Sequence, residues 1–181
     1  MPKPPAPFDL KRSLLEAYAA NERINQYLLE NLDEAAWNAE PPDGKGRTIA
    51  AIVAHMHNVR HMWLVAAAKG KPLPDKLDRA TVTKPQAMEA LARSAQCCAQ
   101  LLAESLEHPE GKVKSFRPDA VGFFGYLVAH DAHHRGQICA LARQTGHALP
   151  KQVTFGMWEW GTRWKEQRGA SAAPPDRREL R

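Results

Sequence analysis

Apolar residues recur three and four positions apart along most of this chain, which is the pattern of amphipathic helices. Segments rich in proline and glycine divide the pattern into four long stretches, at about residues 9–32, 48–69, 85–107 and 118–144. Asp9 and Thr48 begin the first two stretches and can cap helix N-termini, while Pro85 suits a first helical turn. We therefore expect an all-α fold, a four-helix bundle with loops between its helices.

The pattern weakens at both ends of the chain. The first seven residues contain four prolines, so we expect an extended arm over residues 1–8 and the bundle domain over residues 9–168. A shorter stretch, residues 153–165, predicts a fifth helix, and residues 169–181 predict a disordered basic tail. Because aromatic stripes usually bury area, we expect packing rather than a substrate mouth from its aromatic side chains: Phe155, Trp158, Trp160 and Trp164.

Composition limits the classes of function. The 181 residues are 44% hydrophobic and 25% charged, which suits one domain with a continuous core. The net charge is +5, but residues 163–181 hold six basic and three acidic groups and so supply most of it. No dense Lys/Arg stripe is interleaved with aromatic residues, so we expect no specific nucleic-acid partner.

Cysteine usage and hydropathy point to a compartment. Three cysteines, two of them adjacent in a predicted helix, do not make a disulfide framework. The N-terminus lacks an apolar segment of signal-peptide length, and no run approaches the roughly 18 apolar residues of a membrane span. We expect a cytoplasmic protein without a membrane partner.

The eight histidines separate by helix face at about 100° per residue. In the second predicted helix, His55 lies about 60° from the centre of the apolar face, whereas His57 and His61 lie about 140° and 180° away. These two are expected to face water. In the fourth predicted helix, His134 lies about 20° and His130 about 60° from the centre of the apolar face.

Three inward histidines from two helices predict a metal centre. His130 and His134 are one turn apart, so their imidazoles can approach one atom, and His55 faces the same interior. Three neutral imidazoles suit Zn²⁺ or Ni²⁺ and leave a coordination position open. Two alternatives stay open: ordinary core histidines with hydrogen-bond partners, and a site at His57 and His61, whose spacing is also suitable but which lack an apolar frame.

Few other side chains are candidates for the chemistry. Gln137 and Asn21 could orient a ligand imidazole, although ordinary core or interhelical hydrogen bonding is the better explanation of both. Asp131 lies about 40° from the centre of the apolar face of its helix, on the side away from His130, which makes it a poor general base. Cys139 lies too far around the helix from His134 to be a fourth ligand.

Several segments together resemble a known family. They are TIAAIVAHMHNVRHMWL at 48–64, HDAHHRGQI at 130–138, YAANERINQYLLE at 18–30 and WEWGTRW at 158–164. These segments resemble the DinB-like superfamily of damage-inducible proteins, which is unrelated to the translesion polymerase of that name. The resemblance implies a four-helix bundle and a metal held at the positions of His55, His130 and His134.

The resemblance also bounds the activity. Similar proteins include S-transferases that use low-molecular-weight thiols such as bacillithiol, and mycothiol-dependent isomerases. Proteins of this superfamily are often homodimeric. We therefore expect a homodimeric, metal-dependent transferase or hydrolase that acts on a small molecule in stress or detoxification, with a low-molecular-weight thiol as a candidate cofactor. The alternative is a non-enzymatic stress module that binds a metal or a small molecule.

Overall fold

The computed structural model describes residues 7–68 and 70–172, with side chains of the last helix up to Arg168. The expected tail beyond residue 172, and residues 1–6 of the expected arm, lie outside the described residues. The elements are α1 (Leu10–Glu30), η1 (Glu34–Ala36), α2 (Ile49–Ala67), α3 (Lys84–Glu107), α4 (Ala120–Gln144), α5 (Lys151–Gly156) and α6 (Trp160–Ala172). The regular structure of this part of the chain is thus helical, as predicted.

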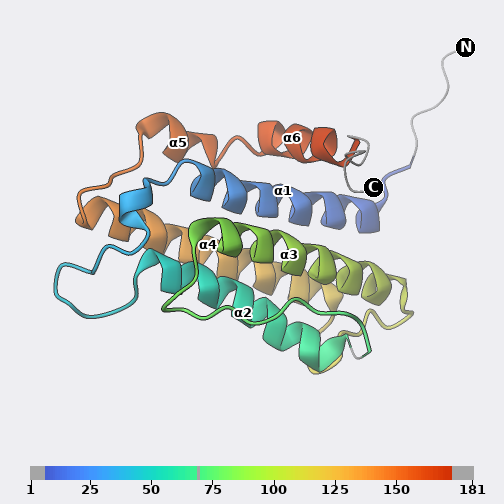
Figure 1. The fold of residues 1–181 in the computed structure, drawn as a ribbon. Helices are drawn as coiled ribbons and strands as arrows, with labels where there is room; N and C mark the ends of the chain where they lie inside the picture. Colours follow the sequence, from blue (N-terminus) through green and yellow to red (C-terminus); the bar gives the residue numbers. More distant parts are fainter. Residues whose placement is uncertain (1–6, 69, 173–181) are drawn as a thin grey trace, which may run out of the picture.

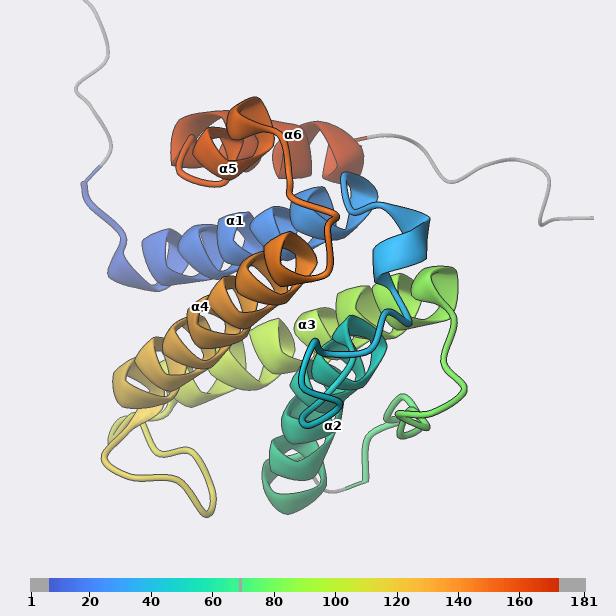
Figure 2. The ribbon, with the colours of Figure 1, turned by 90° about the vertical axis from the view of Figure 1, so that its left-hand side faces the viewer.

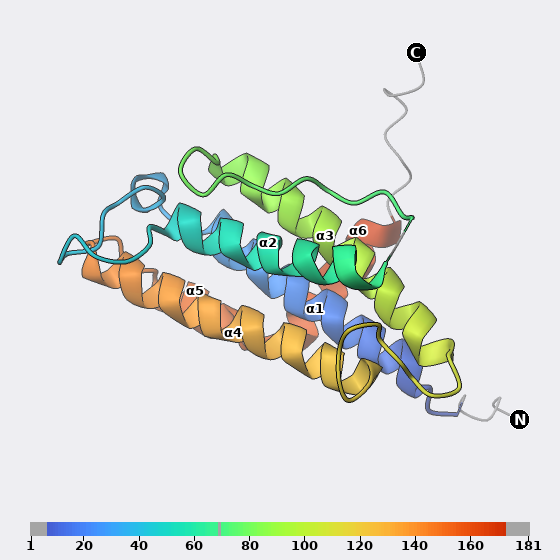
Figure 3. The same cartoon turned by 90° about the horizontal axis from the view of Figure 1, so that it is seen from below.

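Helices α1 to α4 form the bundle (Figure 1). Seen along the bundle, α1 and α2 each pack against both α3 and α4, and α5 and α6 lie outside the bundle on the α1 side (Figure 2). Seen from below, α2 and α4 run side by side (Figure 3). Among the residues described, no helix is both long and apolar enough to cross a membrane.

Side-chain caps fix where the long helices begin. The carboxylate of Asp9 accepts a hydrogen bond from the backbone N–H of Arg12 at 3.0 Å, and Thr48 caps α2 in the same way. Both predicted caps are confirmed. Thr83 starts α3 with a capping box, in which its side chain and that of Gln86 each bond the other's backbone N–H.

The C-terminal region holds two helices where one was predicted over residues 153–165. Helix α5 ends at Gly156, which packs so closely on α1 that an added Cβ would lie 2.5 Å from the Tyr27 hydroxyl oxygen. Helix α6 then lies along α1, with the Arg163 guanidinium carbon 3.9 Å from the centre of the Tyr27 ring. It continues to Ala172, beyond the expected start of the tail at residue 169.

A polar layer divides the apolar core in two. One apolar cluster includes Leu28, Trp37, Ile52, Met56, Leu91 and Ile138, and the other includes Tyr18, Leu64, Cys98, Leu102, Phe123 and Leu127. Buried polar side chains occupy the turns between them in each long helix: Asn21, Glu22, Asn25, Arg60, Ser94, Asp131 and His134. The predicted site therefore lies at the middle of the bundle rather than at its end.

Candidate metal centre

The structure brings His55, His130 and His134 together. His55 comes from α2, and the other two come from successive turns of α4. The Nε2 atoms of His130 and His134 lie 3.2 Å apart, and the His55 ring centre lies 4.8 Å from that of His134 and 5.4 Å from that of His130. One possible ligand atom from each residue lies within 4.8 Å of the others. This cluster can hold a metal ion.

Its donor spacing suits a small divalent cation. Two nitrogens on a tetrahedral zinc at about 2.0–2.1 Å are separated by about 3.3 Å. The 3.2 Å between His130 and His134 matches that separation. His134 is buried while His55 and His130 are only half-buried, so the cluster has one side toward solvent. That side would admit a further ligand.

Burial keeps the three imidazoles neutral. The pKa of His55 and of His130 is lowered to about 4, mainly by desolvation and, as the second cause, by the neighbouring His134. Desolvation also lowers the pKa of His134. Neutral imidazole has a lone pair on one ring nitrogen, which is the form that binds a metal. All three side chains are thus in the ligand form at neutral pH.

Comparison with known proteins settles the family. A family model described as the DinB family matches residues 7–169. This chain belongs to the DinB family. No curated protein and no solved structure gave a significant match. The resemblance inferred from the sequence segments is confirmed, whereas the assignment of the three histidines as ligands stays a prediction.

In this DinB protein, Gln137 orients one of the three histidines. Its Oε1 accepts a hydrogen bond from Nδ1 of His134 at 2.7 Å, which leaves the lone pair of that ring on Nε2, facing His130. Its Nε2 lies 3.0 Å from Nε2 of His133. The proposed orienting role of Gln137 therefore has the geometry it requires.

Asn21, the other candidate orienting residue, does not contact the histidines. Its Nδ2 donates to the carboxylate of Asp131 at 2.7 Å, and its Oδ1 accepts from Arg135 at 2.9 Å. Asp131 is 1% exposed and also pairs with Arg60 at 2.8 Å. Its Oδ2 accepts hydrogen bonds from the side-chain amides of Asn21 and Asn25 and from the guanidinium of Arg60, while its Oδ1 is buried without a hydrogen-bond partner among the described residues. Asp131 is a structural anion, in agreement with the expectation that it is a poor base.

Sequence reasoning missed the role of Arg60. This side chain is fully buried in α2, donates to Glu22 at 2.7 Å and to Asp131 at 2.8 Å, and also bonds the Leu91 carbonyl at 3.0 Å. It thereby joins all four bundle helices, and one of its partners, Asp131, directly follows His130 in α4. The only sequence signal was a run of polar residues, Asn21, Glu22 and Asn25, in the middle of an apolar stripe.

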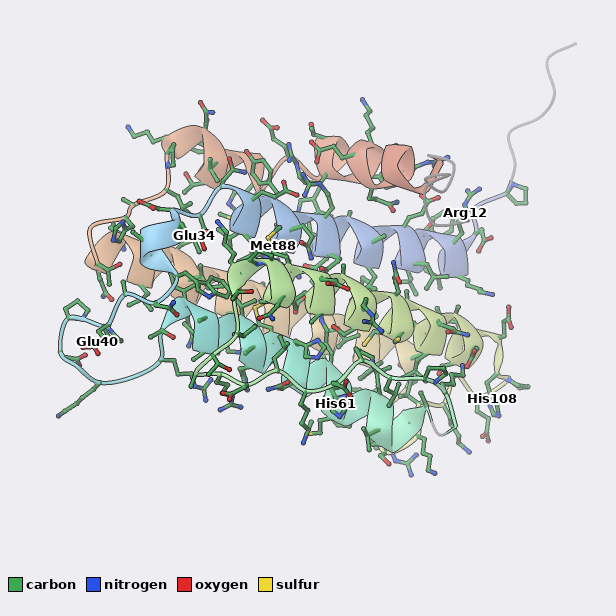
Figure 4. The ribbon with its side chains drawn as sticks, viewed as in Figure 1. Arg12, Glu34, Glu40, His61, Met88 and His108 are labelled. Atoms are coloured by element: carbon green, nitrogen blue, oxygen red, sulfur yellow. The ribbon has the colours of Figure 1, made fainter. Side chains whose placement is uncertain are left out.

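The prediction that His57 faces water is wrong. His57 is fully buried, because the segment between α2 and α3 folds back over this face of α2. Its Nδ1 lies 3.0 Å from the Ala90 carbonyl and its Nε2 lies 2.8 Å from the Asp75 carbonyl. His61 is partly covered by the same segment, with Nδ1 2.9 Å from the Pro74 carbonyl (Figure 4). Backbone oxygens therefore lie at both ring nitrogens of His57, so the alternative metal site lacks a free nitrogen from one of its two histidines.

Proposed function

We propose that this DinB-family protein is a metal-dependent enzyme whose centre is His55, His130 and His134. One observation carries the proposal: three neutral imidazoles converge from two helices with one side of the cluster toward solvent. A purely structural zinc site is normally closed by four protein ligands, whereas a catalytic site keeps a position open. Three imidazole donors favour Zn²⁺ or Ni²⁺.

The reaction that we propose is transfer of a low-molecular-weight thiol to an electrophilic small molecule. When bound, the metal would lower the pKa of a thiol, or of a water in the hydrolase variant of this proposal. The chain's own part is to hold three neutral donors and to fix the proton of His134 on Nδ1 through Gln137. Thiol transfer is favoured over hydrolysis because Asp131, the adjacent carboxylate, is engaged by Arg60 and cannot serve as a general base.

The same engagement of Asp131 supports a second candidate, a non-enzymatic module that binds a metal or a small molecule in stress. The two candidates differ in turnover. We would incubate zinc- and nickel-loaded protein with a panel of thiols and a chloroarene or epoxide, and a panel of esters would test the hydrolase variant. Metal-dependent product formation is expected; its absence from every combination would leave only the binding module.

Metal content tests both candidates together. Elemental analysis of protein purified without a metal-affinity tag should find one Zn or Ni per chain. His134→Ala should abolish this content, while His61→Ala, a matched histidine change on α2, should leave it intact. Full metal content in His134→Ala would refute the site.

The proposal also covers the cellular compartment and the oligomeric state of the protein. The three cysteines, Cys97, Cys98 and Cys139, are free thiols, which supports a reducing cytoplasm as the site of action. A homodimer is supported by large aromatic side chains that stay exposed on α5 and before α6, among them Phe155 and Trp158.

A further inference from the structure

Basic side chains gather beside the histidine cluster without acidic partners. Arg47 precedes α2, and Arg79 lies in the segment between α2 and α3, with Nη2 3.4 Å from Nδ1 of His55. Neither arginine forms an ion pair with a carboxylate of the described residues.

A surface cavity of about 680 Å³ lies near the histidine cluster, although none of the three histidines lines it. It lies between the loop before α2 and the C-terminal half of α4, and its lining includes Lys45, Arg47, Gln137 and Gln144. Gln137 is the residue that bonds His134, so the cavity is one side chain away from the cluster. The acidic lining residue, Asp43, directs Oδ1 to the backbone N–H of Lys45 at 3.1 Å.

The basic side chains place positive charge beside the site at which the proposed function already requires a metal cation. Three neutral imidazoles leave the +2 charge of a divalent ion unreduced, and two arginines beside it would repel it further. Such an arrangement becomes favourable only when an anionic ligand binds there and offsets the charge of the metal ion and that of the arginines. Guanidinium groups bind carboxylates by paired, charge-assisted hydrogen bonds.

We propose that the cavity lined by Lys45 and Arg47 binds a carboxylate of the small-molecule ligand, beside the three-histidine centre. Arg79 flanks the same centre on the His55 side. The inference rests on the proposed metal-dependent function and adds a substrate class to it, namely an anionic thiol or an anionic acceptor.

The test compares charged and uncharged thiols of similar size. Calorimetric titration of zinc-loaded protein with 3-mercaptopropionate and with 3-mercaptopropan-1-ol measures the preference for the carboxylate. We expect about tenfold tighter binding of the carboxylate, the size of one charge-assisted hydrogen bond at a partly exposed site. A third titration uses 2-mercaptoethanesulfonate, because a sulfonate lacks the planar shape of a carboxylate. Weaker binding of the sulfonate than of the carboxylate would indicate a site for carboxylates, and equal binding would indicate a site for anions in general.

Variants locate the effect. Arg47→Gln should reduce the preference to within about twofold, and Arg47→Lys should keep part of it, because the charge remains. Arg12→Gln is the matched control: Arg12 lines a separate hollow of about 430 Å³ at the N-terminal end of α1, far from the loop that holds Glu40 (Figure 4). A preference that survives Arg47→Gln, or that is absent from the wild-type protein, would overturn the inference.

Failure of the metal site and failure of the cavity are distinguishable. Elemental analysis of the loaded protein decides the first independently. For the second, amide chemical shifts of residues 43–47 in metal-free protein should respond to 3-mercaptopropionate and not to the alcohol. If zinc does not bind but these shifts respond, the proposed function fails and the anion cavity stands. If zinc binds and the shifts stay unchanged with both thiols, the cavity assignment fails.

Discussion

Burial lowers the pKa of each histidine of the cluster. A solvated imidazole titrates at about 6.5, but desolvation holds the pKa of His55 and His130 near 4. The cluster therefore loses no metal affinity to protonation at neutral pH. The same burial lowers the stability of the folded state in acid, because protonation below pH 6.5 favours any state in which these rings are solvated.

This effect of burial predicts a pH dependence of folding in the metal-free protein. The folded-state pKa values of His55 and His130 lie below their unfolded value of about 6.5, so the unfolded chain binds more protons between about pH 4 and 6.5. Stability from these groups is complete above this window and is lost as the pH falls through it. Chemical denaturation after chelator treatment, repeated from pH 7.5 to 4, should show the decline. Removing two of the rings with His55→Gln and His130→Gln should flatten it; an unchanged slope would contradict the cause.

The hydrogen bond from His134 to Gln137 predicts an effect on metal affinity. Loss of an outer partner of a ligating histidine typically costs about 10–100-fold in affinity. Gln137→Ala should weaken zinc binding by that factor in a competition titration with a chelator, and Gln137→Glu should retain an acceptor and most of the affinity. Gln144→Ala, which changes another cavity-lining glutamine of α4, should have no effect. Equal affinities in all three variants would remove Gln137 from the site.

At the residue scale, the sequence predicted well where one helix decides the outcome. Helical periodicity turns His55 of α2, and His130 and His134 of α4, toward the interior, and the packing of α2 against α4 then brings them together. His57 was predicted to face solvent, because a helical wheel of α2 takes no account of the segment between α2 and α3 that folds back over His57. The partners of Asn21 escaped prediction for a related reason: Asp131 and Arg135 lie more than a hundred residues away along the chain.

At the scale of elements, the polar layer is the unusual feature of the bundle. Arg60 of α2, Glu22 of α1 and Asp131 of α4 form a buried ion-pair network whose charged side chains are 0%, 12% and 1% exposed. Such networks contribute little net stability over an apolar core, but they are costly to break on one side. The network aligns α1, α2 and α4, which supply or support the three histidines.

The network predicts a large loss of stability when one partner is removed. Arg60→Met leaves the buried Asp131 carboxylate without its cation, which should lower the free energy of unfolding by about 3–5 kcal/mol. The double variant Arg60→Met with Asp131→Leu should recover part of this loss, because only Glu22, whose side chain is 12% exposed, then lacks its cation. Urea denaturation measures both. A single variant within about 1 kcal/mol of wild type would show that the pair does not hold the helices together.

Element boundaries were predictable wherever a capping residue or a glycine ends a helix. Asp9 and Thr48 cap as expected, since capping needs only the local sequence. The division between α5 and α6 was not predictable, because the aromatic pattern of residues 153–165 continues through it. What separates them is tertiary: Gly156 approaches Tyr27 of α1, and the chain then turns so that α6 can follow α1.

For the whole molecule, α6 covers one long side of α1. Arg23 of α1 pairs with Glu166 at 2.8 Å, and the Trp164 indole N–H donates to Glu16 at 3.0 Å. These contacts account for Trp164, one of the four aromatic residues expected to pack. Phe155 and Trp158 do not follow that expectation, since they are 68% and 79% exposed. Their apolar area is therefore exposed in the part of the chain that the structure describes.

A second copy of the chain is the partner that we expect at this surface. Homodimers with two-fold symmetry are the commonest soluble oligomers, and large exposed aromatic residues often mark their interfaces. Light scattering coupled to gel filtration should give about twice the chain mass of 20.2 kDa at micromolar concentration. Phe155→Ser with Trp158→Ser should shift the protein toward the monomer, whereas Val121→Ser, which changes an exposed apolar residue of α4, should not. A wild-type monomer at every concentration would rule out the dimer, and dissociation by Val121→Ser alone would move the interface to α4.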